Sequence, residues 1–385
     1  MKRVGVFEIA RRAKVSIGTV DRALHQRPGI SDPTRERVLR IAKKLGYTPD
    51  PAARALAVRR CEFLVGVCIP EEIRLFYDQM RDGIFDEICR GGHLGVEIVY
   101  RPVPSLGEGE RRQLTRLLKE NLRGLIVMPG NPRIVTPLID AAEARGVRVV
   151  CICSDAPQSR RSTVVFANPQ LQGRMAAELL SKFIPASADV AVITGMLRTE
   201  EHRLKVEGFR AGFAEQSYTG RIARVVEAHE YEEESYRKTR ELLRENPKLR
   251  GIYVTTVNCL PVCRAVREEG RGNDVRLVTT DLFPQMAPYF ENGIISASIY
   301  QDPYSQGQNA MRVLLDYALQ KAPIAASNSL NPGVVLQSNI HLFREVRLSG
   351  VERQQAKLAS AIAKYTTAET RTGTRITRSP ATPAN

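Results

Sequence analysis

From residue 63 the chain alternates short apolar runs with amphipathic segments. The apolar runs, each five to seven residues long, predict strands at 63–69, 96–100, 124–128, 147–153, 189–194, 222–226, 251–256, 275–279 and 294–299. The segments between them predict helices at about 76–91, 108–121, 133–145, 170–183, 201–216, 232–245, 260–269, 284–292 and 304–320. Strands that are apolar almost throughout are covered on both faces, which predicts parallel sheets flanked by helices. Nine strands over this length favour a two-lobed α/β body.

Ahead of this body, residues 1–48 have the pattern of a small all-α domain. Apolar spacing predicts three helices, at 6–13, 16–24 and 33–45. Ser16 and Asp32 are the candidate N-caps of the second and third helices. Helices this short bury a common core only by packing together, and two short helices joined by a tight turn indicate a helix-turn-helix.

The net charge of +15 is concentrated at the two ends of the chain. Residues 1–60 hold 15 Lys and Arg against 5 Asp and Glu, whereas residues 61–350 hold 36 against 35. A basic segment of domain size beside a neutral body is typical of nucleic-acid binding, although an anionic membrane would also attract it. Residues 348–385 form a polar, basic tail whose composition predicts disorder.

Residues 47–57, YTPDPAARALA, connect the small domain to the body. Asp50 has the chemistry of an N-cap, Pro51 suits a first helical position, and the alanines that follow are strong helix formers. A helix of fewer than about 12 residues is marginal in water, because so few hydrogen bonds do not offset nucleation. We therefore expect this segment to become helical only against a partner.

The sequence offers little support for a membrane, metal or catalytic site. No run of 18 apolar residues occurs, and the segment after Met1 is too short for a signal-peptide core, which favours a cytoplasmic location. The seven cysteines lie mostly in apolar runs and are expected to be reduced core thiols rather than metal ligands. Because nucleotide-binding, metalloprotease and serine-hydrolase motifs are all missing, we expect neither a cofactor nor enzymatic activity.

The motifs VSIGTVDRAL and LGYTPDPAARAL, together with the body as far as VVLQSNIHLFRE, resemble the lactose-repressor (LacI) family of bacterial transcription regulators. The resemblance covers roughly residues 4–345. It implies a helix-turn-helix DNA-binding domain at 1–48, a hinge helix at 49–61, and a body at 62–347 like a type I periplasmic sugar-binding protein. Lys14 departs from the family, which usually has glycine in this turn.

Carried onto this chain, the resemblance makes Ile17, Gly18 and Arg22 the base-reading positions. The chemistry agrees, because arginine can donate two bonds to guanine, isoleucine can contact a thymine methyl, and glycine permits close backbone approach. Ser16, Thr19 and Arg54 are assigned to phosphates, which set position without reading sequence. Leu56, which is flanked by alanines, is assigned as a wedge that unstacks a base step from the minor groove, and Ala53 of the hinge is assigned to DNA binding as well.

In the body, the resemblance points to polar and aromatic residues near strand ends as the effector site: Phe76, Tyr77, Asp155, Arg203, Lys205, Asn258, Asp281 and Gln301. Sugars are bound by this mixture, since aromatic rings stack on C–H faces while polar side chains bond hydroxyls. Each of these residues also has a structural alternative in capping or ion pairing. The two cationic side chains would suit a carboxylated or phosphorylated sugar.

The expected function is a sequence-specific DNA-binding regulator, most simply a repressor. As a homodimer it would bind a pseudo-palindromic operator in double-stranded DNA, under the control of a small sugar-like effector. Two alternatives belong to other classes: an extracytoplasmic sugar-binding protein, which leaves residues 1–60 unexplained, and a sugar-modifying enzyme, for which no catalytic pair is evident.

Overall fold

The computed structural model describes residues 6–24, 29–45, 63–90, 95–216, 218–320 and 323–342. Its head consists of three helices: α1 (Val6–Ala13), α2 (Ile17–Leu24) and α3 (Asp32–Lys44). They bury a shared core of Ile9, Ala10, Ala13, Val20, Ala23, Val38 and Ala42. The expected three-helix head is therefore present. Its third helix begins one residue earlier than predicted, because Ser31 rather than Asp32 occupies the N-cap position.

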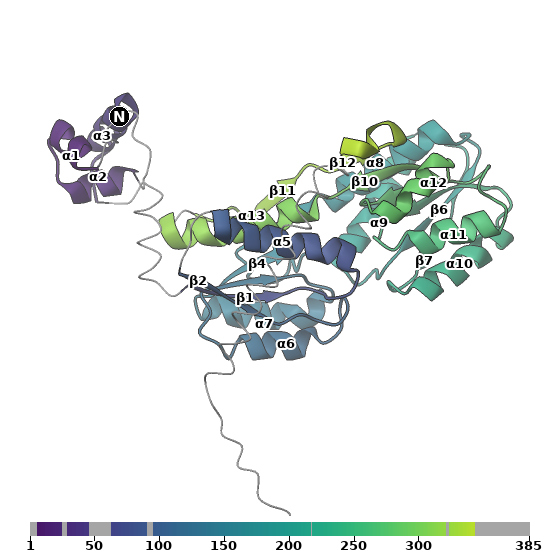
Figure 1. Ribbon diagram of the computed structural model, residues 1–385, viewed down its shortest axis with the longest axis horizontal. Coiled ribbons are helices and arrows are strands. Elements are labelled where there is room, and N and C mark those ends of the chain that lie inside the picture. Colours follow the sequence, from purple (N-terminus) through teal and green to yellow (C-terminus); the bar gives the residue numbers. More distant parts are fainter. Residues whose placement is uncertain are drawn as a thin grey trace, which may run out of the picture. The chain divides into compact units, whose positions relative to one another are not determined.

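The first lobe of the body is a six-stranded parallel sheet in the order β11-β5-β4-β3-β1-β2. Its strands are β1 (Phe63–Cys68), β2 (Val96–Tyr100), β3 (Gly124–Val127), β4 (Arg148–Ile152), β5 (Thr163–Ala167) and β11 (Ser327–Leu330). Its helices are α5 (Arg74–Arg90), α6 (Glu110–Leu117), α7 (Pro132–Ala144) and α13 (Pro303–Gln320). Helices α5 and α13 pack together over one face, while α6 and α7 cover the other (Figure 1).

The second lobe repeats this plan with the strand order β12-β10-β9-β8-β6-β7. Its strands are β6 (Asp189–Thr194), β7 (Ile222–Glu227), β8 (Leu249–Val254), β9 (Arg276–Thr280), β10 (Ile295–Tyr300) and β12 (Gly333–Val335). Its helices are α8 (Pro169–Phe183), α9 (Glu200–Glu215), α10 (Glu232–Glu245), α11 (Leu260–Glu268) and α12 (Ala287–Glu291), with short 3-10 turns η1 (Pro284–Met286) and η2 (Gln337–Asn339). The chain passes between the lobes three times: after β5, after β10 and between β11 and β12.

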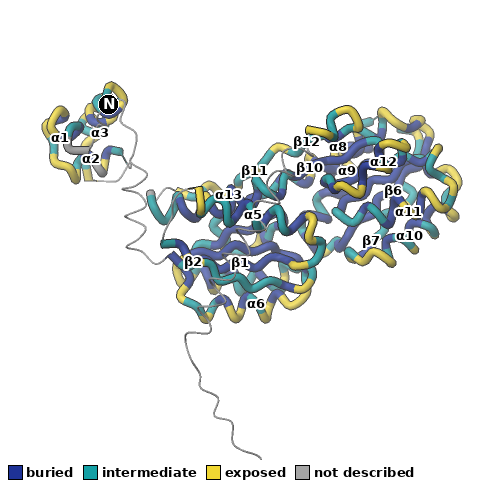
Figure 2. The backbone as a smooth tube through the Cα atoms, viewed as in Figure 1, coloured by how far each residue is buried: buried dark blue, intermediate teal, exposed yellow. Residues whose placement is uncertain are grey.

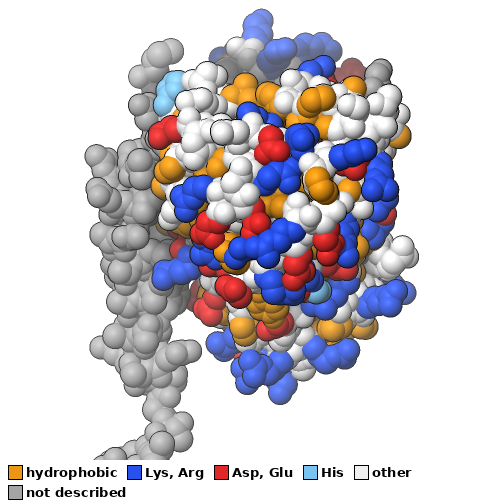
Figure 3. Space-filling view, turned by 90° about the vertical axis from the view of Figure 1, so that its right-hand side faces the viewer, with side chains coloured by type: hydrophobic (Ala, Val, Ile, Leu, Met, Phe, Trp, Pro, Cys, Tyr) orange, Lys and Arg blue, Asp and Glu red, His pale blue; other side chains and the backbone are white. Residues whose placement is uncertain are grey.

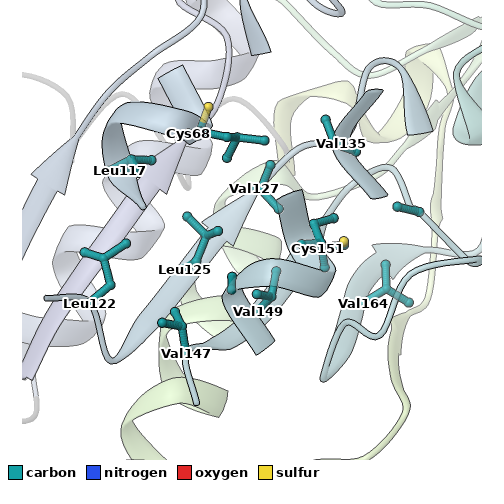
Figure 4. Close-up of a cluster of buried hydrophobic side chains, with 14 of the residues drawn as sticks. Cys68, Leu117, Leu122, Leu125, Val127, Val135, Val147, Val149, Cys151 and Val164 are labelled. Atoms are coloured by element: carbon teal, nitrogen blue, oxygen red, sulfur yellow. The ribbon is translucent and has the colours of Figure 1, made fainter. Parts of the chain in front are cut away.

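Apolar strands form the centre of each lobe, and their helices shield them from water (Figure 2). In the first lobe, Leu125, Val127, Val149 and Cys151 pack against the inner faces of α6 and α7 (Figure 4). On the face drawn in Figure 3, Lys and Arg are interspersed with Asp and Glu, as the balanced charge of residues 61–350 predicts. This two-lobed α/β architecture with an all-α head confirms the expected fold class.

The nine predicted strands are all present, and three further strands are added within the described residues. The additions are β5, β11 and β12, which are three to five residues long. Of the six cysteines described, five are buried as expected, but Cys89 lies exposed near the end of α5. Among the described residues, no helix is long and apolar enough to cross a membrane.

Candidate functional site

Helix α2 divides into a buried stripe and an exposed face. Val20 and Ala23 are fully buried in the head core, whereas Ile17 keeps 44% of its surface exposed. Ser16, Gly18 and Arg22 are exposed as well, and Thr19 is half-buried. The Ser16 hydroxyl accepts a bond from the Thr19 backbone N–H at 3.1 Å, which confirms Ser16 as the cap of this helix. All five predicted head residues therefore lie on or beside one face of the helix start.

Gly18 is not required by the packing of the head itself. A Cβ at this position would come no closer than 3.8 Å to the Ser16 hydroxyl, which is ordinary van der Waals distance. Glycine inside a helix costs about 1 kcal/mol relative to alanine. The missing side chain thus opens space on the outer face of α2 and relieves no internal clash.

The turn between α1 and α2 contains the residue that departs from the family. Lys14 adopts a left-handed conformation with φ of 51°, which glycine adopts without steric cost. Lys14 therefore carries backbone strain that a glycine in this turn would not.

A small cavity of about 20 Å³ between the lobes is the candidate effector site, and a sugar would enter it only with some separation of the lobes. The first lobe contributes mainly apolar and aromatic side chains, and the second lobe mainly polar ones. The lining residues are Phe76, Tyr77, Leu106, Met128, Cys153, Glu201, His202, Lys205, Glu230, Thr255, Thr256, Val257 and Gln301. Most of them follow the carboxyl ends of strands or begin the next helix, where ligands of parallel α/β folds bind.

Four of the eight predicted effector residues line this cavity. Phe76 and Tyr77 lie at the start of α5, with their rings edge to face and their centroids 5.0 Å apart. Lys205 is 1% exposed, and its ammonium donates to the Thr255 carbonyl at 2.9 Å. Gln301, directly after β10, completes the set.

The other four residues are not among the lining residues, and each has a structural partner. Asp155 accepts two bonds from the Arg161 guanidinium, and Arg203 on the outer side of α9 pairs with Glu200 and Glu207. The Asn258 amide donates to the Glu230 carbonyl at 3.1 Å, which supports the loop that carries Glu230. Asp281 accepts from the backbone and the side-chain amide of Gln301, so it holds a lining residue in place.

Sequence reasoning missed three ionisable residues that line the cavity: Glu201, His202 and Glu230. Glu201 and Lys205 form an ion pair one helical turn apart on α9. The pKa of His202 is lowered, mainly by burial and against the influence of Glu201. The Met196 N–H donates to its Nδ1 at 3.0 Å, so the neutral ring carries its proton on Nε2, 3.3 Å from both Glu201 and Glu230.

Left-handed backbone conformations gather at the strand ends that surround the cavity. Cys153 follows β4 with φ of 63°, His229 and Glu230 follow β7 with φ of 48° and 64°, and Asp281 follows β9 with φ of 63°. Each costs a non-glycine residue roughly 1–2 kcal/mol. Such strain persists only where the surrounding structure enforces it, and it is typical of functional sites.

Two hydrogen bonds join the lobes beside the cavity. The Thr199 hydroxyl, which precedes α9, donates to the Gly130 carbonyl at 2.7 Å. The Tyr231 hydroxyl donates to Glu108 at 3.0 Å.

Within the described residues, no group of three His, Cys, Asp or Glu side chains is placed to hold a metal ion. The predicted hinge residues Ala53, Arg54 and Leu56, and the tail at 348–385, lie outside the described residues.

Comparisons with known proteins match both parts of the chain. Residues 65–322 match the family described as "Periplasmic binding protein domain", and residues 6–50 match "Bacterial regulatory proteins, lacI family". Catabolite control protein A of Priestia megaterium is 26% identical over 82% of this chain and 92% of its own. The ribose operon repressor of Halalkalibacterium halodurans is 24% identical over 83% of this chain and 91% of its own.

Among solved structures, GanP, a glucose-galactose binding protein from Geobacillus stearothermophilus, has the same body fold. Its TM-score is 0.67 at 23% identity, and the match covers 73% of this chain and 99% of that one. A helix-turn-helix head joined to a two-lobed binding-protein body defines the class of bacterial DNA-binding transcription regulators with a ligand-binding domain. Within that class, the chain combines a DNA-binding region of the lacI family of bacterial regulatory proteins with a body that belongs to the periplasmic binding protein domain family.

Proposed function

We propose that the chain is a repressor that binds a pseudo-palindromic DNA operator as a homodimer and releases or engages it in response to a small polyol effector. In this proposal residues 1–48 bind the major groove, 49–61 form the hinge, 62–347 bind the effector and dimerise, and 348–385 are an appended tail. The observation that carries it is the exposed face of α2, which combines a free helix start with Ile17, Gly18 and Arg22.

Each head residue has a role that its exposure supports. Arg22 would donate to a guanine, a contact worth about 1–3 kcal/mol of base discrimination, and Ile17 would contact a thymine methyl. The space left by Gly18 would admit the edge of the groove. Ser16 and Thr19, at the positive end of the helix, would bind phosphate. In the hinge, Arg54 would bind phosphate, Leu56 would enter the minor groove, and Ala53 would also contact DNA.

The cavity between the lobes supports a polyol as the effector. Phe76 and Tyr77 supply ring surfaces, while Lys205, Gln301, Thr255 and Thr256 supply donors and acceptors for hydroxyl groups. Solute-binding proteins of the same fold have been crystallised with D-arabinose and with D-allose. Asp281 and Asn258 would act by holding Gln301 and the Glu230 loop. Asp155 and Arg203 would serve the fold through their ion pairs.

An effector would act by changing how firmly the lobes are closed. Thr199 and Tyr231 bond across the lobes beside the cavity, so a ligand that fits the closed arrangement would strengthen it. The change would alter the spacing of the two hinge segments in the dimer and therefore their ability to become helical on DNA. A ligand has this effect only through a difference in its affinity for the two arrangements.

Selection from a random double-stranded DNA library with the full chain tests this function. We expect enriched sequences to contain two inverted half-sites, and Arg22→Ala to lose a guanine preference at one position of each half-site. Arg11→Ala serves as the control, because Arg11 is exposed on α1 and already pairs with Glu8. Failure of the full chain to enrich any sequence would refute the proposal. The enzymatic and extracytoplasmic alternatives have less support, because the relatives described above are named as regulators of gene expression.

A further inference from the structure

The Glu230 carboxylate is buried in the cavity without a cationic partner. Its side chain is 6% exposed, and neither of its oxygens makes a hydrogen bond of ordinary geometry with the described residues. Its polar neighbours are the Thr256 hydroxyl and Nε2 of His202, which lies 3.3 Å from Oε1 and at the same distance from Glu201. A buried acceptor left in this state costs free energy unless something else binds it.

The charges around the cavity leave this carboxylate without a counter-ion. Lys205 is taken by Glu201, and His202 is neutral because burial lowers its pKa. Burial, followed by Glu201 and Glu72, raises the pKa of Glu230 to about 8, against the smaller opposing effects of Lys205 and Thr256. The other polar residues that line the cavity, Tyr77, Thr255, Thr256 and Gln301, are uncharged.

The backbone that carries Glu230 at the edge of the cavity is strained. His229 and Glu230 are consecutive left-handed residues, and the Asn258 amide fixes the Glu230 carbonyl from the next loop. By contrast, Glu232 and Glu233 at the helix start that follows are exposed. A strained backbone that buries an unpartnered acid is typical of a binding group and not of a solvated surface residue.

The same residues disfavour an anionic effector. Of the two cations that the sequence placed near the site, Arg203 is outside the cavity and bound to Glu200 and Glu207, and Lys205 is neutralised by Glu201. A carboxylated or phosphorylated sugar would find no free cation in the cavity, and its negative charge would oppose ionisation of Glu230. The expectation of an acidic sugar, drawn from the sequence, therefore loses its basis.

We propose that the effector carries a cationic nitrogen that binds the carboxylate of Glu230, so that the effector is an amino sugar or a similar amino-polyol. An ammonium group supplies both the missing counter-charge and up to three hydrogen-bond donors. The rings of Phe76 and Tyr77 line the cavity from the first lobe, whereas Glu230 belongs to the second, and they would cover the carbon skeleton. This inference rests on the proposed polyol effector and specifies that the effector is positively charged.

Calorimetric titration of the full chain with matched hexose derivatives tests the inference. The probes are D-glucose, D-galactose and D-mannose, their 2-amino derivatives, D-glucuronate, D-galacturonate and D-glucose 6-phosphate. We expect an amino hexose to bind about tenfold or more tightly than its neutral parent, as for a charge-assisted hydrogen bond. In Glu230→Gln this preference should fall to about onefold, because the amide has the same shape but no charge. Glu233→Gln, an exposed acid three residues away, is the matched control and should keep the wild-type preference.

The outcomes separate this inference from the function on which it rests. If neutral or anionic hexoses bind and the amino derivatives bind no better, the inference is overturned while the polyol effector stands. If Glu230→Gln retains the amino preference, the cation does not bind Glu230 and the inference is wrong. If none of the probes binds, the polyol effector itself fails, and the inference falls with it.

Discussion

Replacing Glu230 by glutamine should stabilise the free protein, and the gain should depend on pH. Burial raises the pKa of this carboxyl from 4.5 to about 8. Between these values the folded chain holds a proton that the unfolded chain has released, so the free energy of unfolding falls as the pH rises. Below about pH 4.5 the group has no effect, and above about pH 8 its cost is constant. Glutamine removes the ionisation and leaves the shape unchanged.

The size of the effect follows from the shift. Each pKa unit corresponds to about 1.4 kcal/mol. At pH 7 the shift of Glu230 therefore costs the wild type at most about 3 kcal/mol, and from pH 8 upward at most about 5 kcal/mol. Relaxation of the cavity and entry of water would make the measured values smaller. Glu230→Gln should therefore exceed the wild type by less than about 1 kcal/mol near pH 5 and by increasingly more up to pH 8.

Urea denaturation of the full chain at pH 5, 7 and 8.5 measures this difference. Glu233→Gln, exposed on the same turn, should show no change of stability with pH relative to the wild type. A Glu230→Gln protein that is less stable than the wild type at every pH would mean that the carboxylate has a structural partner. A gain that does not grow between pH 5 and 8 would mean that Glu230 is not ionised at a cost, and either result would refute the reasoning.

Three further predictions concern the DNA-binding part. Gly18→Ala should stabilise the head by up to about 1 kcal/mol, because a Cβ meets open space there. The same substitution should weaken specific DNA binding. Thermal unfolding should therefore show a more stable protein, and fluorescence anisotropy a lower operator affinity. Lys14→Gly should stabilise the head by about 1 kcal/mol through relief of the left-handed φ of 51°, with operator affinity retained, and a destabilised variant would contradict the strain. Leu56→Ala should weaken operator binding more than binding to random DNA while the calorimetric affinity for the effector is unchanged; equal losses on both DNAs would count against a wedge.

Strand prediction succeeded for nine apolar runs, among them the central strands β1 and β6 and the edge strands β2 and β7. It missed β5, although this strand is apolar, buried and interior to its sheet. The missed β11 has the sequence SNSL and alternates exposed and half-buried residues at a sheet edge, so it has no apolar run to detect. Its pairing with β5 depends on the return of the chain from the second lobe, which local sequence does not encode.

Only half of the predicted effector residues line the cavity. One reason is that residues close together in a helical sequence can lie on opposite faces of the helix. Glu201 and Lys205 lie one turn apart and share the buried face of α9, whereas Arg203 between them is rotated to the outside. Glu230 was overlooked because it adjoins three glutamates that do form a solvated helix start. Its left-handed conformation separates it from them, and no residue preference in the sequence signals such a conformation for glutamate.

The unpaired Glu230 also supplies a way for the effector to act on DNA binding. With the lobes joined as they are here, ionised Glu230 is costly, and separation of the lobes would hydrate it and remove the cost. A cation on Glu230 removes the cost only in the joined arrangement, which gives the effector the differential affinity that a switch requires. Glutamine removes the same cost without any ligand. In the absence of sugar, Glu230→Gln should therefore shift operator affinity, measured by anisotropy, in the direction in which the effector shifts the wild type. A shift in the opposite direction would show that relief of this charge does not drive closure.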